Sequence, residues 1–130
     1  MSRKTDRFIV RPRIREELIH HDIDRAKQEI GLSYNYMDSS LVPEADIHVG
    51  LQEVKQVPPD FKPFIKPHKH DVSQFYGIVG DLSIEVTLED ERHDVNGPAS
   101  IFIPAGMMHS FCPLKGSGYI IIVLGKEKYE

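Results

Sequence analysis

Three histidines in two short segments are the residues of this sequence best suited to chemistry. His68 and His70 stand two residues apart, and His109 lies further along the chain. Side chains alternate between the two faces of an extended strand, so histidines two residues apart project from the same face. A third imidazole from a strand close in space would complete a set of nitrogen donors. Neutral imidazole commonly binds zinc, iron, copper or nickel, so the pattern predicts a metal site.

A tight turn is predicted directly before His109. Pro104, Ala105 and Gly106 follow a short apolar stretch at 101–103. Proline sets φ and glycine permits a positive φ, so the chain can reverse direction sharply there. A buried strand followed by such a turn would aim the imidazole of His109 back into the protein. Taken alone, His109 is equally compatible with a hydrogen-bonded core histidine, and an exposed His-x-His pair can occur by chance.

Further polar residues are candidates for the same site. Gln74 lies four residues after His70, and both it and Tyr76 share the histidine face if the strand has no bulge. Gln74 could bind metal, orient a water, hydrogen-bond a substrate, or touch only solvent. Tyr76 could donate its hydroxyl to a substrate. Glu53 could be a general base if a slip in the alternation at 53–54 turns it inward. His48 lies opposite the apolar face of its strand, which predicts an outward position or a dimer contact.

The chain from residue 47 onward has the pattern of short strands. The clearest alternation runs from Leu82 to Glu89, and Gly80 with Asp81 provides the turn before it. Other strands are expected at 47–52, 75–79, 101–103 and 119–124, with another beginning at His109, and turns are expected at 89–94, 96–98 and 115–118. Short strands at a spacing of about ten residues predict an all-β sandwich or barrel.

Residues 1–44 are predicted to form an N-terminal extension, and residues 45–130 the β-barrel. Apolar residues at spacings of three and four from Ile14 to Ile30 predict a short helix that Gly31 ends. Residues 33–43 are expected to be a connecting segment. The extension is expected to pack a helix outside the barrel or to lend a strand to a second subunit.

The composition is that of one soluble globular domain. The chain has 130 residues, of which 40% are hydrophobic and 28% charged. A net charge of −4 with a pI near 6.0 argues against a nucleic-acid partner. No apolar run approaches the roughly 18 residues that cross a bilayer, and no signal-peptide pattern is seen, so a cytoplasmic location is expected. Exposed sheet edges predict a homodimer with isologous contact.

The two histidine segments together resemble the two motifs of the cupin family. The first family motif is His-x-His, three or four residues, Glu and then Gly. Here it begins at His68 and His70 and has Gln74 in the place of Glu, with the glycine one residue early. The second motif is Gly, a short strand, Pro-x-Gly, two residues and His, and here it spans 97–109. The resemblance covers about residues 45–125.

This resemblance implies a double-stranded antiparallel β-barrel, a jelly roll, that is often dimeric and holds a metal inside one end. The implied ligands are His68, His70 and His109, with Gln74 standing where the family has its glutamate. Replacing that carboxylate by an amide leaves the site near +2, which should favour an anionic ligand and weaken metal binding. Iron, zinc, manganese and nickel all remain possible metals.

Three functions are compatible with these residues, and we favour a metal-dependent enzyme acting on a small oxygen-rich anion. Dioxygenase chemistry and Lewis-acid lyase or isomerase chemistry both fit such a site. The alternatives are a non-catalytic small-molecule binding module and a barrel that serves mainly in assembly. The sequence contains no phosphate loop, nucleophile elbow or dinucleotide motif. The general acid or base stays unassigned, because no Asp or Glu can be placed within reach of the metal from the sequence, and Tyr76 or a metal-bound water could serve instead.

Overall fold

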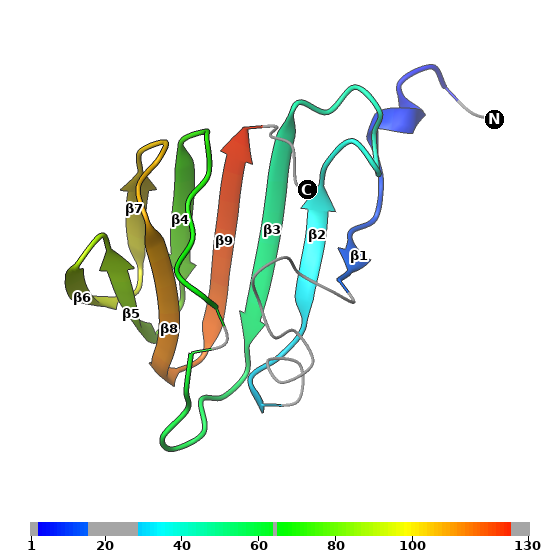
Figure 1. The fold of residues 1–130 in the computed structure, drawn as a ribbon. Helices are drawn as coiled ribbons and strands as arrows, with labels where there is room; N and C mark the ends of the chain where they lie inside the picture. The colour runs from blue at the N-terminus through cyan, green and yellow to red at the C-terminus, as the bar shows by residue number, and fades with distance from the viewer. Residues whose placement is uncertain (1–2, 16–28, 64, 126–130) are drawn as a thin grey trace.

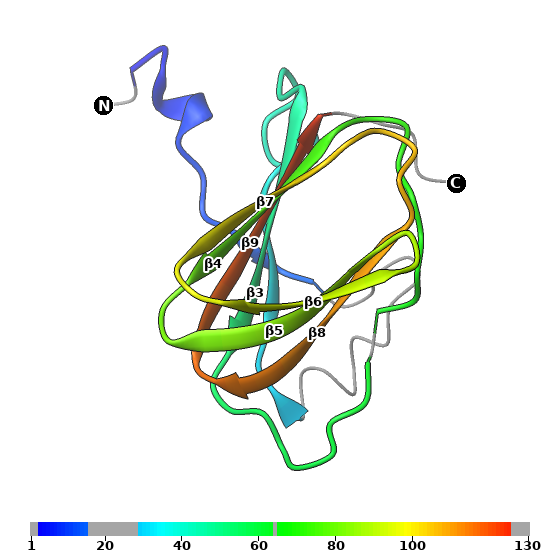
Figure 2. The ribbon, with the colours of Figure 1, turned by 90° about the vertical axis from the view of Figure 1, so that its left-hand side faces the viewer.

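A computed structural model describes residues 3–15, 29–63 and 65–125. Its elements are η1 (Asp6–Phe8), a 3-10 helix, and the strands β1 (Arg13–Ile14), β2 (Ser33–Met37), β3 (Ile47–Val54), β4 (Gln74–Val79), β5 (Leu82–Leu88), β6 (Glu91–Asn96), β7 (Ala99–Ile103), β8 (His109–Gly116) and β9 (Gly118–Gly125). The six-stranded sheet has the order β1-β2-β3-β9-β4-β7, and the three-stranded sheet has the order β6-β5-β8. The two sheets face each other (Figures 1 and 2). The predicted all-β architecture is confirmed.

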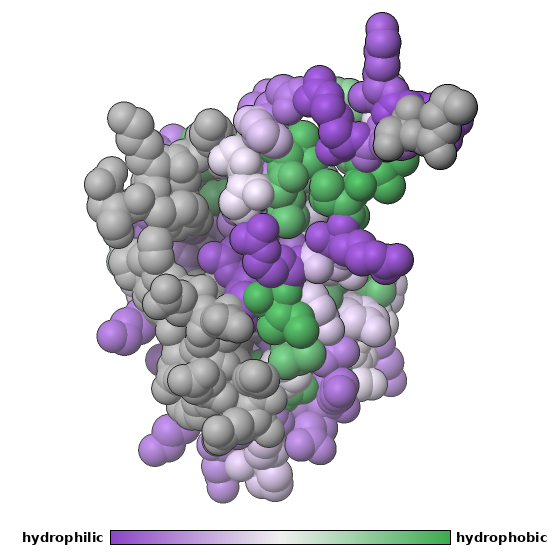
Figure 3. All heavy atoms as spheres, turned by 90° about the vertical axis from the view of Figure 1, so that its right-hand side faces the viewer, coloured by the Kyte–Doolittle hydropathy of each residue, from purple (hydrophilic) through white to green (hydrophobic). Residues whose placement is uncertain are grey.

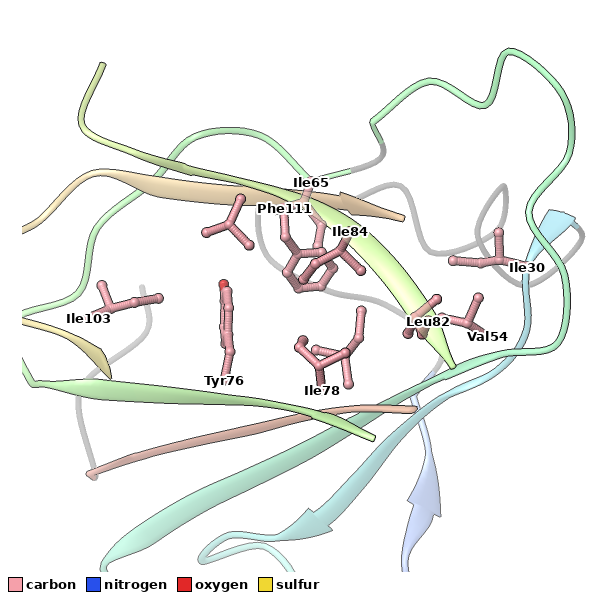
Figure 4. Close-up of a cluster of buried hydrophobic side chains, with 11 residues drawn as sticks. Ile30, Val54, Ile65, Tyr76, Ile78, Leu82, Ile84, Ile103 and Phe111 are labelled. Carbon is pink, nitrogen blue, oxygen red and sulfur yellow. The ribbon is translucent and has the colours of Figure 1, made fainter. Parts of the chain in front are cut away.

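The core lies between the two sheets and follows from the period-two alternation of the strands. Its buried members are Ile30, Val54, Ile65, Tyr76, Ile78, Leu82, Ile84, Val86, Ile103, Phe111 and Ile120 (Figure 4). The alternation predicted for residues 82–89 is confirmed, because Leu82, Ile84 and Val86 are almost completely buried. The hairpin turn expected over 89–94 is shorter than predicted, since β6 already begins at Glu91.

The register of the six-stranded sheet determines which side chains share its inner face. Gln74 on β4 lies opposite Leu124 on β9, and Leu124 lies opposite His48 on β3. Directly opposed residues of antiparallel strands project from the same face. His48 therefore lies on the inner face together with Gln74, and the outward position predicted for it is wrong.

The N-terminal extension adds two strands to the larger sheet. Residues 33–43, expected to be a connection, contain β2, which pairs with β3, and β1 pairs with β2. The strand escaped prediction because its inward side chains at Ser33 and Asn35 are polar. The predicted helix falls largely on residues 16–28, outside the described residues, although Ile14 at its expected start lies in β1. The division of the chain at residue 44 stays a prediction.

The strand β3 is regular over its whole length. It pairs with β9 without interruption from Ile47 opposite Gly125 to Val54 opposite Gly118, so the slip predicted at 53–54 is wrong. The irregularity lies instead in β2, between Asn35 and Met37.

The edge of the larger sheet at β1 carries a mixed surface. Viewed from that side, apolar and hydrophilic groups lie next to one another (Figure 3). Exposed apolar residues of this part of the chain include Phe8, Ile9 and Ile14. Within the described part of the chain, no helix has the length and apolarity needed to span a membrane.

The turn between β8 and β9 gives a test of the fold. Gly116 has a φ of +93°, and a Cβ there would lie 2.1 Å from the carbonyl oxygen of Asp81. We expect Gly116→Ala to reduce the free energy of unfolding by about 2 kcal/mol or more, because backbone has to move. Gly125→Ala is the matched control, since within the described part of the chain its new Cβ would meet only Val72, at 3.9 Å. Equal urea midpoints for the two variants would contradict this account of the turn.

Candidate metal centre

A pair of reciprocal backbone hydrogen bonds places His68 beside His109. The amide of His68 donates to the carbonyl of His109 at 3.1 Å, and the amide of His109 donates to the carbonyl of His68 at 2.8 Å. The two residues form an isolated antiparallel bridge outside the longer ladders. In such a pair both side chains project to the same side. Residues far apart in the sequence thus present their imidazoles together.

The predicted turn before His109 is confirmed and also contacts the other histidine segment. The amide of Met107 donates to the carbonyl of Pro104 at 3.2 Å, and Gly106 has a φ of +83°, as in a type II turn. Pro104 occupies the first position of this turn. The amide of Gly106 donates to the carbonyl of His70 at 2.8 Å. A Cβ on Gly106 would meet no atom of the described residues within 4 Å, so glycine is needed there for its φ and not for space.

The three imidazoles converge. One ring nitrogen from each of His68, His70 and His109 can be chosen so that all three lie within 4.8 Å of one another. The ring centroids are 4.9 Å apart for His68 and His70, 4.5 Å for His68 and His109, and 5.3 Å for His70 and His109. His68 and His109 are buried, whereas His70 is partly exposed, so the group can be reached from the His70 side.

Backbone carbonyls set the orientation of the two buried rings. Nδ1 of His68 lies 2.6 Å from the carbonyl oxygen of Lys66, and Nδ1 of His109 lies 3.0 Å from that of Met107. A carbonyl oxygen can only accept a hydrogen bond, so Nδ1 carries the proton in both rings. In a neutral imidazole this leaves the lone pair on Nε2, which is the atom a metal would bind.

The donor set fits a divalent metal. Among the described residues, Nε2 of His109 and Oε1 of Gln74 are buried atoms without a hydrogen-bond partner. Burial lowers the pKa of His109 below the usual 6.5, although the hydrogen bond to Met107 opposes this, and the neutral ring is the form that binds metal. Bonds of about 2.1 Å would hold two nitrogens about 3 Å apart, so small side-chain movements would complete the site.

The other predicted site residues lie at different distances from the histidines. Tyr76 is buried, and its ring centroid lies 5.9 Å from that of His109 and 5.1 Å from that of Phe111. Figure 4 shows Tyr76 extending from β4 toward the opposite sheet. Gln74 lies on the inner face at the same end of β4, opposite Ile103, which immediately precedes the turn. The structure therefore brings both residues to the histidine end of the barrel.

Glu53 lies away from the three histidines. It is opposite Tyr119 on the row that faces away from the core, and Tyr119 is opposite Val79 at the far end of β4. Val79 is five residue steps along β4 from Gln74, which corresponds to about 17 Å. Its carboxylate accepts a hydrogen bond from the amide of Leu32 at 3.3 Å. The structure thus gives Glu53 a backbone contact and does not place it near the imidazoles.

A second polar group on the inner face was missed at the level of sequence. Nη1 of Arg15 lies 3.2 Å from Nε2 of His48, and Nδ1 of His48 lies 3.9 Å from Oδ2 of Asp38. Burial and the Arg15 charge lower the pKa of His48, while Asp38 opposes the shift. The spacing of these three residues gives no motif, and only the pairing of β1, β2 and β3 brings them together.

The comparisons with known proteins show the fold. No family model matches the chain, and no curated protein matches it. The polyketide cyclase RemF from Streptomyces resistomycificus is 23% identical with a TM-score of 0.59, over 98% of this chain and 81% of RemF. KdgF from a Halomonas species is 16% identical with a TM-score of 0.56, over 75% and 81% of the two chains.

Two further solved structures are similar to this chain, one described with metal centres and one named a cupin. Bacillus subtilis oxalate decarboxylase, described with Mn(II) centres, is 17% identical with a TM-score of 0.58; the match covers 78% of this chain and 27% of the decarboxylase. An RmlC-like cupin from Shewanella frigidimarina is 13% identical with a TM-score of 0.52, over 72% and 75% of the two chains. At these identities the likeness establishes the fold and leaves the reaction open.

The lowered pKa of His48 predicts a pH dependence of stability. Between that pKa and the usual 6.5, the unfolded chain binds a proton that the folded chain does not. The free energy of unfolding is therefore expected to fall as the pH decreases through about 6.5. His48→Gln should flatten this dependence in urea unfolding at about pH 7.5 and about pH 5.5 with chelator present. His93→Gln, on the exposed strand β6, is the matched substitution to be measured beside it. An undiminished pH dependence in His48→Gln would contradict the assignment.

Proposed function

We propose that this chain, which has the cupin fold, is a metal-dependent enzyme that acts on a small oxygen-rich anion. His68, His70 and His109 would hold the metal. The observation that carries the proposal is the pair of carbonyl contacts that fix the protons of His68 and His109 on Nδ1. With the proton on Nδ1, each of these two rings presents the lone pair of its Nε2 beside a third imidazole, an arrangement typical of metal-binding histidines.

The remaining residues of the site explain why an anion is favoured. When bound, a metal would supply Lewis-acid activation of substrate oxygens or, as iron(II), redox chemistry with O₂. Among the described residues, no carboxylate or thiolate joins the three-histidine group, so its ligands are neutral and the ion keeps its charge. The unpartnered Oε1 of Gln74 would bind the metal or accept a hydrogen bond from substrate. The buried ring of Tyr76 packs against His109, and its hydroxyl would be a further hydrogen-bonding group for a substrate.

A non-catalytic binding module is the second candidate function. It is favoured by the position of Glu53, one of the candidate catalytic residues, which lies on the outer side of the larger sheet away from the histidines. In this alternative the metal would hold a small molecule without converting it. The solved neighbours carry different activities by name, a decarboxylase and a cyclase, so the fold does not choose between enzyme and binder. A homodimer and a cytoplasmic location stay predictions.

Metal content tests the proposal. Protein purified without an affinity tag should contain close to one equivalent of a divalent metal, or take it up on titration, when measured by inductively coupled plasma mass spectrometry. His109→Ala should reduce the affinity by about a hundredfold or more, because it removes one of three nitrogen ligands. His93→Ala is the control, since His93 lies on β6, outside the group. Equal metal content in the two variants would exclude the three-histidine site.

Replacing Gln74 by Glu tests where its side chain points. The new carboxylate would restore the negative charge that the family motif has at this position. We expect Gln74→Glu to raise the affinity for Zn²⁺ or Mn²⁺ by about tenfold or more in calorimetric titrations. Without metal the buried carboxylate should lower the midpoint of thermal unfolding. A loss of stability without any gain in affinity would place Gln74 outside the metal site.

A further inference from the structure

Asn35 is a further buried polar residue on the inner face of the larger sheet, on the β2 side. Asn35 on β2 lies opposite Gly50 on β3, Gly50 lies opposite Ile122 on β9, and Ile122 lies opposite Tyr76 on β4. Because Tyr76 belongs to the buried core, this row faces inward, and Asn35 with it. The row is adjacent to the one that contains Gln74 and His48.

The amide of Asn35 has a fixed orientation and an unused acceptor. Its side chain faces the carboxylate of Asp38, which can only accept a hydrogen bond, so the amide nitrogen is the atom on that side. Asn35 is only 7% exposed, and among the described residues its Oδ1 has no hydrogen-bond partner. A buried amide oxygen is unfavourable without a donor, and rotating the amide would break the contact to Asp38.

Glycine at position 50 leaves the space of a methyl group beside Asn35. Among the described residues, a Cβ on Gly50 would meet only the carbonyl oxygen of Tyr34, at 3.7 Å, and Cβ of Ile122, at 3.9 Å. The next row toward the rim holds His48 and Asp38, whose side chains are 18% and 26% exposed, so solvent reaches the edge of this group.

The charge of the neighbouring residues limits the chemistry of the donor. The Arg15 guanidinium lies 3.2 Å from His48 and is always protonated, which disfavours an ammonium group nearby. A neutral hydroxyl can donate to Oδ1 of Asn35 without that repulsion. Gln74 and Asn35 are three strand spacings apart, about 14 Å between backbones, and their side chains project over the same inner face. A ligand that contacts both residues would have to span this distance.

We propose that Asn35, above Gly50, is a second subsite that accepts a hydrogen bond from a hydroxyl group of the ligand. This inference rests on the proposed function, because it takes the carboxylate of the same ligand to bind at the three histidines. The ligand class is then a polyhydroxylated carboxylate, with its charged end at the metal and its hydroxyl end at Asn35.

Calorimetric titration of the zinc-loaded protein with gluconate and hexanoate tests the subsite. The two acids share a six-carbon chain, and only gluconate carries hydroxyl groups. We expect the parent to bind gluconate at least about tenfold more tightly than hexanoate. Asn35→Leu should bind the two acids with nearly equal affinity and should keep the zinc content of the parent. Gly50→Val should also weaken gluconate, because its side chain would occupy the space beside Asn35. Met37→Leu, on the same strand, is the control and should bind gluconate as the parent does.

Equal affinity of the parent for the two acids, or an unchanged gluconate preference in Asn35→Leu, would overturn the subsite. If Asn35→Leu does not fold, Gly50→Val decides, and undiminished gluconate binding in that variant overturns the subsite. If the parent holds no zinc, the metal site fails independently, and the titrations are run with chelator. A gluconate preference that Asn35→Leu removes would then still support the subsite, and no preference would overturn it.

Discussion

The reciprocal backbone pair between His68 and His109 is the contact on which the site depends. The segment that carries His68 and His70 has no strand of its own, and these two hydrogen bonds attach it to the start of β8. That start is itself held by β5, because His109 lies opposite Leu88 in the smaller sheet. The packing of β5 in the core therefore helps to hold the two imidazoles in place, because backbone pairing connects β5 to His109 and His109 to His68. A site built on paired strands is held more precisely than one on free loops.

The two buried histidines use the same local means to fix their protons. Each places Nδ1 against the carbonyl oxygen of the residue two positions earlier, Lys66 for His68 and Met107 for His109. The tautomer is therefore set within each segment, before any contact to a metal or substrate. Such carbonyl partners raise the basicity of the ring and hold its plane. The fold brings the segments together, and the local backbone prepares each ring for binding.

Sequence patterns predicted the features that depend on short-range chemistry. The alternation of residues 82–89, the turn ending at Gly106 and the grouping of two histidine segments all follow from local rules, and the structure has all three. The errors arose where tertiary pairing decides. The strand β2 has polar inward residues, so no apolar pattern marked it. His48 was placed outward because its inward neighbours in the strand are a glycine and a glutamine, and only the register with β9 shows its face.

The most direct test of the account is a crystal structure of the metal-loaded protein with anomalous diffraction at the metal edge. The account predicts one ion bonded to Nε2 of His68 and Nε2 of His109, together with His70, while both Nδ1 atoms keep their contacts to Lys66 and Met107. An ion bonded through Nδ1 of either buried ring, or located away from the three histidines, would contradict it.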